Sequence, residues 1–213
     1  MERLPVYTDI MVDLETTHTL PDRGGILQIA AVKFNLKENQ VSPDFFDMCL
    51  TVPNHRHWSE GTRNFWLNQK ESVLQEILQR AEPWRDVMEK FMEYSYPINH
   101  LRFWSKPSHF DYNFLSSYFS DYGMPMPFHY RDANDMNSFL RGLYYEQDGK
   151  VPDLNLPFVG EVHNALFDTL HQVRVLLHHV HEIKRDAKKL IQQVTDATYT
   201  EVNNAGATKI IEG

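Results

Sequence analysis

The order of apolar and polar residues predicts three strands in the first quarter of the chain. Apolar and β-forming residues fill Thr8–Leu14 and Ile26–Phe34, with Pro21 and a Gly-Gly pair between them. A third run, Phe45–Val52, follows a polar, turn-rich stretch over residues 35–43. Short apolar runs bounded by turn residues are typical of strands. Three consecutive strands of this kind predict an antiparallel meander.

Helical periodicity dominates the middle of the chain. Apolar residues recur at i, i+3, i+4, i+7 and i+8 from Trp84 to Met92, and Pro83 suits the first helical position. A strand over Ile98–Trp104 is expected next, followed by a loop and a helix. The apolar residues of that helix are Phe110, Phe114, Leu115 and Tyr118.

Two further helices complete the predicted fold. A short strand near Phe128–Tyr130 leads into a helix over Met136–Leu143. The closing helix is long, and its apolar face should pack on the sheet; this face carries Leu166, Leu170, Val173, Leu177 and Val180. The pattern predicts an α/β protein with a mixed central sheet, three leading antiparallel strands and flanking helices. We expect one domain over residues 1–195 and a polar tail over 196–213, either flexible or docked on a partner.

Composition narrows the classes of function. The 213 residues include a single cysteine, Cys49, which excludes an internal disulfide and indicates a reducing compartment. No apolar stretch approaches the roughly 18 residues of a membrane span, so we expect a soluble, cytoplasmic protein. The formal charge of −8 argues against binding of nucleic acid by diffuse positive charge. A polyanion would have to be held locally, most simply through metal ions.

The first candidate site is a pair of acids at the end of the first strand. Asp13 and Glu15 are two residues apart, so their side chains project to the same face of a strand. With 29 acidic residues in the chain, about 4 such pairs occur by chance. Glu146 and Asp148 have the same spacing beside Gly149, where solvated turn residues are the ordinary interpretation. Turn or capping chemistry is therefore the alternative for Asp13 and Glu15 as well.

Three more candidates follow later in the chain. Asp111 stands at a strand-to-helix junction, where its alternative role is a helix N-cap. His163 and Asp168 form a His-x4-Asp spacing at the start of the closing helix. Positions five apart on a helix differ by about 140° in azimuth. His163 should therefore lie in the loop before the helix, free to turn towards a site that Asp168 faces.

The ordered combination of these motifs resembles the DEDDh 3′–5′ exonucleases, and within them the RNase T-like group that includes phage exonuclease A. The resemblance covers roughly residues 8 to 180 and includes all five catalytic positions in order. It implies an RNase H-like fold and a phage or bacterial origin. The segments that carry it are residues 11–16 (MVDLET), 104–111 (WSKPSHFD) and 161–168 (EVHNALFD). One departure is Phe167, where some relatives have a second histidine.

Metal dependence follows from the chemistry of four converging carboxylates, which repel one another unless cations hold them. Oxygen ligands favour Mg²⁺ or Mn²⁺. The resemblance implies two divalent ions bound by Asp13, Glu15, Asp111 and Asp168, with Asp13 bridging both. It also implies that His163 is the general base and that the products are nucleoside 5′-monophosphates.

The substrate contacts are predicted less directly. Leu14, as the resemblance implies, would wedge against the terminal base. Arg131 is either a phosphate contact or an ion-pair partner of Asp132. Aromatic side chains could stack on bases without sequence preference, although core packing is their alternative role. The predicted contacts are Leu14, Thr16, Trp66, Trp104, Tyr112 and Arg131.

The expected partner is the single-stranded 3′ end of DNA or RNA, and the sequence does not distinguish the two sugars. The sequence does not define the oligomeric state, and the resemblance to the RNase T-like group is compatible with a homodimer. Two rival interpretations remain at this point. One is a catalytically weak nucleic-acid-binding module of the same fold, and the other is an α/β protein that is not a nuclease and whose acids are caps and turns.

Overall fold

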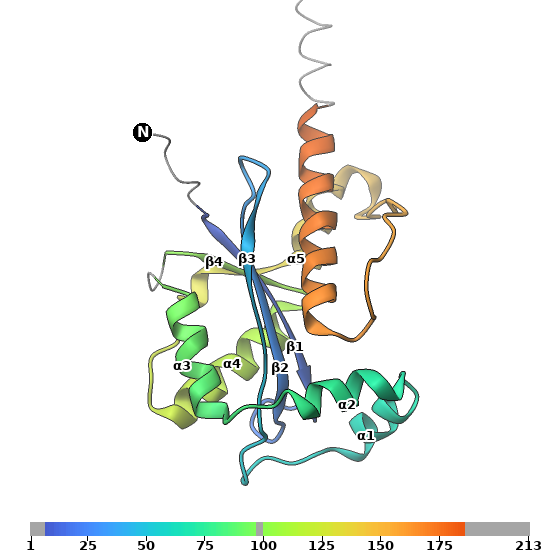
Figure 1. The fold of residues 1–213 in the computed structure, drawn as a ribbon. Coiled ribbons are helices and arrows are strands. Elements are labelled where there is room, and N and C mark those ends of the chain that lie inside the picture. The colour runs from blue at the N-terminus through green and yellow to red at the C-terminus, as the bar shows by residue number, and fades with distance from the viewer. Residues whose placement is uncertain (1–6, 97–99, 186–213) are drawn as a thin grey trace, which may run out of the picture. The chain divides into compact units, whose positions relative to one another are not determined.

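A computed structural model describes residues 7–96 and 100–185, and its sheet has five strands in the order β3-β2-β1-β4-β5 (Figure 1). The first three strands pair antiparallel, as the predicted meander requires, whereas β4 runs parallel to β1 and β5 runs parallel to β4. The predicted mixed sheet is therefore confirmed. The strands are β1 (Asp9–Thr16), β2 (Ile26–Asn35), β3 (Gln40–Cys49), β4 (Arg102–Ser105) and β5 (Ala133–Asp135).

Helices surround this sheet, and the chain divides into two compact units, residues 1–176 and 177–213. In the first unit the last helical segment covers residues 165–176. In the second unit residues 177–185 are helical, and the predicted tail 196–213 lies outside the described residues. The other helices are α1 (Glu60–Leu67), α2 (Glu71–Gln79), α3 (Trp84–Tyr94), α4 (Ser108–Tyr122) and α5 (Met136–Leu143), with 3₁₀ turns η1 (Tyr130–Asp132) and η2 (Tyr145–Gln147).

The two faces of β1 meet different surroundings because side chains alternate along a strand. Ile10, Val12 and Leu14 belong to the main apolar cluster, which also contains residues of α3 and α4. The opposite face carries Asp13 and Glu15. Figure 1 shows α3 on one side of the sheet and the helical residues 165–176, in orange, on the other. The alternation of β1 therefore places the two acids on the side of the closing helix.

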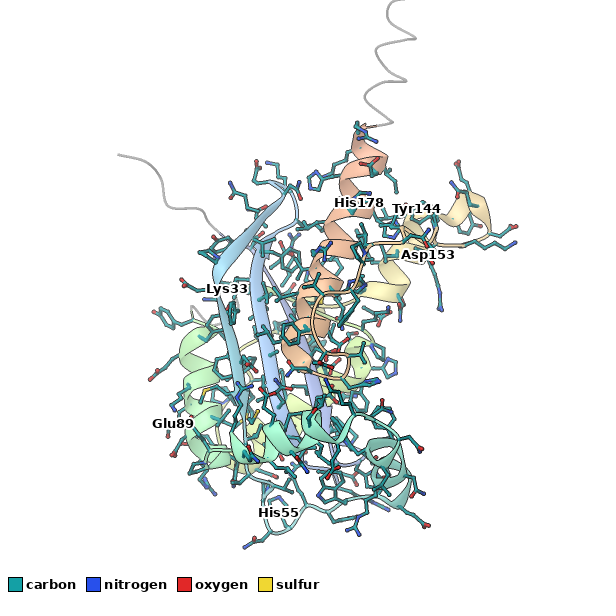
Figure 2. The ribbon with its side chains drawn as sticks, turned by 45° about the vertical axis from the view of Figure 1, so that its right-hand side comes forward. Lys33, His55, Glu89, Tyr144, Asp153 and His178 are labelled. Carbon is teal, nitrogen blue, oxygen red and sulfur yellow. The ribbon has the colours of Figure 1, made fainter. Side chains whose placement is uncertain are left out.

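The α3 side of the sheet is closed by aromatic packing. Phe91 of α3 is fully buried, and its ring lies 5.3 Å from that of Phe46. Complete burial of such a side chain contributes roughly 1.5–3 kcal/mol. Lys33 of β2, labelled in Figure 2, places its ammonium group 4.5 Å from the centre of the Tyr94 ring. This apolar layer fixes the sheet against which the site is built.

A buried arginine holds the turn between β1 and β2. The Arg56 side chain is 1% exposed, and its guanidinium donates to the carbonyl oxygens of Pro21 and Gly24. It also donates to the Ser117 hydroxyl and to the Asp121 carboxylate of α4. The Asp121 pairing lowers the pKa of that carboxyl against the raising effect of burial. One side chain thus connects the β1–β2 turn to α4.

Several predicted strand boundaries are wrong. β3 begins at Gln40, not at Phe45, and Pro43 lies within it. This is possible because β3 is an edge strand with a register irregularity opposite residues 32–34, where the missing proline N–H is not needed. The strand expected near Phe128–Tyr130 lies instead at β5, after η1. β4 begins at Arg102, and residues 97–99 of the predicted strand lie outside the described residues.

The predicted helices are present, with changes at their first turns. Pro83 is the N-cap of α3 rather than its first residue, and α4 begins at Ser108 after an N-cap at Pro107. Asp111 is therefore not an N-cap but the fourth residue of α4. Glu146 and Asp148 lie in and just after the 3₁₀ turn η2, as the turn interpretation predicted. No helix among the described residues is long and apolar enough to cross a membrane.

Candidate active site

Three carboxylates converge where β1 meets the closing helix. Asp13 and Glu15 project from the same face of β1, and Asp168 is the fourth residue of helical segment 165–176. One ligand atom from each lies within 4.8 Å of the others. Alternation along β1 puts Asp13 and Glu15 on one face. The position of Asp168 depends instead on where the helix over residues 165–176 begins relative to the sheet.

Paired polar contacts set the start of that helix. The amide N–H of Ala165, its first residue, donates to Oε1 of Gln28 on β2 at 3.0 Å. Asn164 caps the helix, and its Oδ1 accepts from the Leu166 amide at 3.2 Å. Backbone donors of a first helical turn have no partner within the helix. Gln28 and Asn164 satisfy two of them and so place the helix against the sheet, one turn before Asp168.

Asp111 approaches the same acids from α4. Asp111 is 3% exposed, and its interactions with Ser105 and with the backbone of Leu14 lower its pKa against the raising effect of burial. The pairing between β1 and β4 covers only residues 9–11 of β1. Leu14 therefore lies beyond the residues of β1 that pair with β4. Asp111 is not among the three carboxylates that meet within 4.8 Å, but its charge acts on both Asp13 and Glu15.

The acids raise one another's pKa because they are buried together. Burial, and the nearby charge of Asp168, raise the pKa of Asp13 to about 7, although a hydrogen bond from Gln172 opposes the shift. Burial and the other three acids hold the pKa of Glu15 well above its ordinary value, and burial with Asp13 does the same for Asp111. Burial also raises the pKa of Asp168, while His163 and Lys106 lower it. The site therefore concentrates negative charge that the protein alone does not neutralise.

His163 lies in the loop before the closing helix, as the helix geometry predicted. Its backbone is left-handed, with φ of 61°. Its ring meets the Phe65 ring of α1 edge-to-face at 4.9 Å. A salt bridge of 2.5 Å between Lys70 and Glu161 ties the same loop to the segment between α1 and α2. The Phe65 ring therefore supports the imidazole, and the salt bridge anchors the loop that carries it.

A hollow of about 390 Å³ adjoins the acids. Leu14 and Glu15 form one wall, while Phe65 and Trp66 of α1 form another, so three predicted substrate contacts, Leu14, Thr16 and Trp66, border it. Trp66 is 4% exposed, and its indole N–H donates to the Thr16 carbonyl oxygen at 3.3 Å. Trp66 therefore builds the wall, whereas Phe65, 40% exposed, presents an open ring. The remaining lining residues are Thr19, Ser59, Gly61, Thr62 and Phe110.

The other three predicted contacts are placed differently. Trp104 is 2% exposed, and its indole N–H donates to the buried Asp9 carboxylate at 2.9 Å, so the prediction that it stacks on a base is wrong. Tyr112 donates its hydroxyl to the Phe128 carbonyl oxygen and packs on Phe103. Arg131 is exposed over the Tyr130 ring, and no ion pair to Asp132 is formed among the described residues. Neither Tyr112 nor Arg131 borders the hollow.

The donor set fits a hard divalent cation. The ligands are carboxylate oxygens, which Mg²⁺ and Mn²⁺ prefer. The three ligand atoms lie within 4.8 Å of one another, so divalent cations could be held among them. A bound cation would also remove the repulsion that raises the pKa values of these acids.

The arrangement defines a class of protein: a DEDD-type 3′–5′ exonuclease on a mixed sheet flanked by helices. The sequence model of the family described as "3'-5' exoribonuclease Rv2179c-like domain" matches residues 8–180. The chain belongs to this family. The resemblance to 3′–5′ exonucleases found in the sequence is thereby confirmed at the level of the DEDD class. A search of curated proteins gave no match.

Solved structures share the fold at low sequence identity. Cell-death related nuclease 4 (CRN-4) matches with a TM-score of 0.62 and 16% identity over 82% of this chain and 64% of its own. E. coli exonuclease I in complex with a dT13 oligonucleotide matches with a TM-score of 0.62 and 14% identity over 89% of this chain and 44% of its own. Exonuclease I from Methylocaldum szegediense gives 0.60 and 16%, over 79% and 39%. The chain thus spans less than two thirds of these relatives.

One contact at the site was missed by sequence reasoning. Gln172 donates from Nε2 to Oδ1 of Asp13 at 2.8 Å. The only signal in the sequence is its position four residues after Asp168, on the same face of the helix. A glutamine at that spacing is too common to be singled out without the fold.

Proposed function

We propose that this chain is a divalent-metal-dependent exonuclease that removes nucleotides from the 3′ end of single-stranded DNA or RNA and releases nucleoside 5′-monophosphates. Family membership supports the direction and the reaction class. The observation that carries the proposal is the convergence of three carboxylates from β1 and the closing helix, with a fourth from α4 acting on them.

Each acid has a proposed part in holding two cations. Asp13, which meets both Glu15 and Asp168, would bridge both ions, and Glu15, Asp111 and Asp168 would complete their ligands. Two bound cations of this kind stabilise the attacking and leaving oxygens of a phosphodiester and lower the pKa of bound water. One relative, E. coli exonuclease I, has a structure described as a zinc-bound complex with single-stranded DNA. That description concerns the relative, and metal use by this chain is part of the proposal.

His163 is the proposed general base. A histidine titrates near neutral pH and can take a proton from the attacking water. Its place in the loop before the closing helix, with its ring against Phe65, supports this role. Phe65 and Leu14 line the neighbouring hollow and would contact the terminal base. Stacking on an open ring is tolerant of base identity.

The experiment is digestion of 5′-labelled single strands of DNA and RNA, each with a free or a blocked 3′ end. A ladder that shortens from the free 3′ end in Mg²⁺ or Mn²⁺ and disappears with EDTA is expected. Endonucleolytic products, or degradation of the 3′-blocked strand, would contradict the proposed direction. Binding of the strands without metal-dependent shortening would favour the rival interpretation, a binding module of the same fold.

A matched pair of histidine variants tests the role of His163. We expect His163→Ala to lower turnover by about 10²–10⁴-fold, the usual contribution of a general base, while stabilisation by Mn²⁺ is retained. His100→Ala replaces an exposed histidine remote from the acids in sequence and serves as the control. Near-normal turnover of His163→Ala would remove the imidazole from the mechanism. A cytoplasmic location and a homodimer stay predictions from the sequence.

A further inference from the structure

Gln172 provides the hydrogen bond that the Asp13 side chain receives within the described residues. The bond joins Nε2 of Gln172 to Oδ1 of Asp13 at 2.8 Å and spans 159 positions of sequence. The neighbours of Asp13 on the site are Glu15 and Asp168, which can only repel it or compete for a cation when ionised. A donor on one oxygen is therefore what limits the rotation of this carboxylate.

The position of Gln172 couples two metal-site acids. Gln172 follows Asp168 by four residues, so both side chains leave the same face of the closing helix. Asp168 joins the acid cluster directly, and Gln172 contacts Asp13 of β1 one turn further along. The helix thereby presents one ligand to the site and a support for another ligand.

The chemistry of the amide suits this place better than a charged group would. A lysine would bring a positive charge that competes with a cation, and a glutamate would add a further negative charge. The neutral amide donates to the Asp13 carboxylate without changing the net charge of the site.

The amide oxygen of Gln172 has no structural role that packing would explain. Gln172 is 9% exposed, and its Oε1 is buried without a hydrogen-bond partner among the described residues. Leaving a buried acceptor unpaired costs about 1–3 kcal/mol, which an apolar side chain of the same length would not incur. Amide geometry places Oε1 within roughly 5 Å of the bonded Asp13 oxygen. The unpaired Oε1 is closed to solvent, so the amide serves the site through its Nε2 donor to Asp13.

We propose that Gln172 is a positioning residue of the metal site, which holds the Asp13 carboxylate in the orientation that binds the cation. This inference rests on the proposed function, since it assumes that the acids bind metal. Groups outside the direct ligands that orient them change metal affinity or activity by about 10–100-fold when they are replaced.

The test compares Gln172→Met with the wild type. Methionine keeps the length of the side chain and removes both polar ends. Thermal melting in EDTA should change little, because the disappearance of an unpaired buried acceptor offsets the loss of the hydrogen bond to Asp13. The Mn²⁺ concentration that gives half of the metal-induced melting shift should rise about tenfold or more. Gln79→Met, an exposed methionine substitution in α2, is the control and should leave this concentration unchanged.

Kinetics separate positioning from general structural damage. With Gln172→Met, turnover should fall most at low Mn²⁺ and recover in large part at saturating Mn²⁺, while the KM for the oligonucleotide changes little. Gln172→Asn keeps the amide but shortens the side chain, so it should also weaken metal binding. It provides a second test in case the methionine variant does not fold. A half-saturating Mn²⁺ concentration within about twofold of wild type in both variants, well short of the effect expected for an orienting group, would overturn the inference. A wild type that neither binds Mn²⁺ nor shortens a strand would instead overturn the proposed function.

Discussion

Without metal, Asp13 should destabilise the folded protein at neutral and alkaline pH. Its folded-state pKa is raised to about 7, against an ordinary value of 3.8, chiefly by burial. Between these values the native state holds a proton that the unfolded state has released. The stability from this group is therefore full below about pH 3.8 and is lost as the pH rises through 7. The difference between the two pKa values corresponds to a loss of about 4 kcal/mol.

Replacement of Asp13 by asparagine tests this magnitude, because asparagine keeps the shape of the side chain and cannot ionise. The amide oxygen of the new side chain can still accept the hydrogen bond from Gln172. Titration with the same two pKa values makes wild type lose about 2.5 kcal/mol between pH 5 and pH 8 from this group. The variant should not lose it. We therefore expect metal-free Asp13→Asn to gain about 2.5 kcal/mol over wild type between these pH values, although it is inactive.

The assay is urea unfolding in EDTA at pH 5 and pH 8. A relative gain of about 2.5 kcal/mol corresponds to a melting temperature about 5–10 °C higher at pH 8 for a chain of this size. Asp132→Asn, at an exposed acid of η1, is the control and should show no pH-dependent gain. If Asp13→Asn gains nothing on going from pH 5 to pH 8, the buried carboxylate is not strained by its charge and the reasoning fails.

Metal binding, a buried arginine and a crowded glycine give three further predictions. At pH 8, Mn²⁺ at a hundred times its Kd should stabilise wild type by about 2.7 kcal/mol. The same Mn²⁺ concentration should stabilise it less at pH 6, because the metal must displace protons from acids whose pKa is raised; equal shifts in thermal melting at the two pH values would contradict this. Arg56→Met should cost about 2–4 kcal/mol in urea unfolding, since the carbonyl oxygens of Pro21 and Gly24 lose their donor and Asp121 loses its arginine partner. Exposed Arg23→Met should cost under about 1 kcal/mol; equal losses would refute the role of the network. Gly160→Ala should cost about 1–3 kcal/mol, because φ is +104° and the new Cβ would lie 2.3 Å from the Phe167 ring. In contrast, Gly142→Ala, which meets open space, should be neutral or stabilising in the same melting assay, and similar melting of the two variants would contradict the clash.

The elements that sequence reasoning predicted well are those defined by local periodicity. β1, β2, α3 and α4 follow from the spacing of apolar residues, because a strand or helix exposes a fixed face to its neighbours. The same local geometry put Asp13 and Glu15 on one face. It also put His163 in a loop, since five residues on a helix cannot bring His163 and Asp168 to one side.

Where the local signal was weak, the predictions failed for identifiable reasons. Pro43 was taken as a turn residue, yet an edge strand with an irregular register accommodates it. The strand after α4 was placed at residues 128–130, but backbone pairing with β4 selects residues 133–135. Apolar character alone does not distinguish a wall residue from a core residue. Trp66 borders the hollow and Trp104 is buried against Asp9, although both are tryptophans near predicted site residues.

The sequence by itself determined which groups are present and which share a local face: two acids on a strand, an acid in the first turn of a helix, and a histidine before another acid. Only the tertiary structure decided their distances. Asp168 reaches the β1 acids because Gln28 and Asn164 fix the start of its helix on the sheet. Gln172 reaches Asp13 for the same reason. Contacts between residues as far apart in the chain as the 159 positions from Asp13 to Gln172 depend on how the layers pack, and no periodicity within either segment encodes that packing.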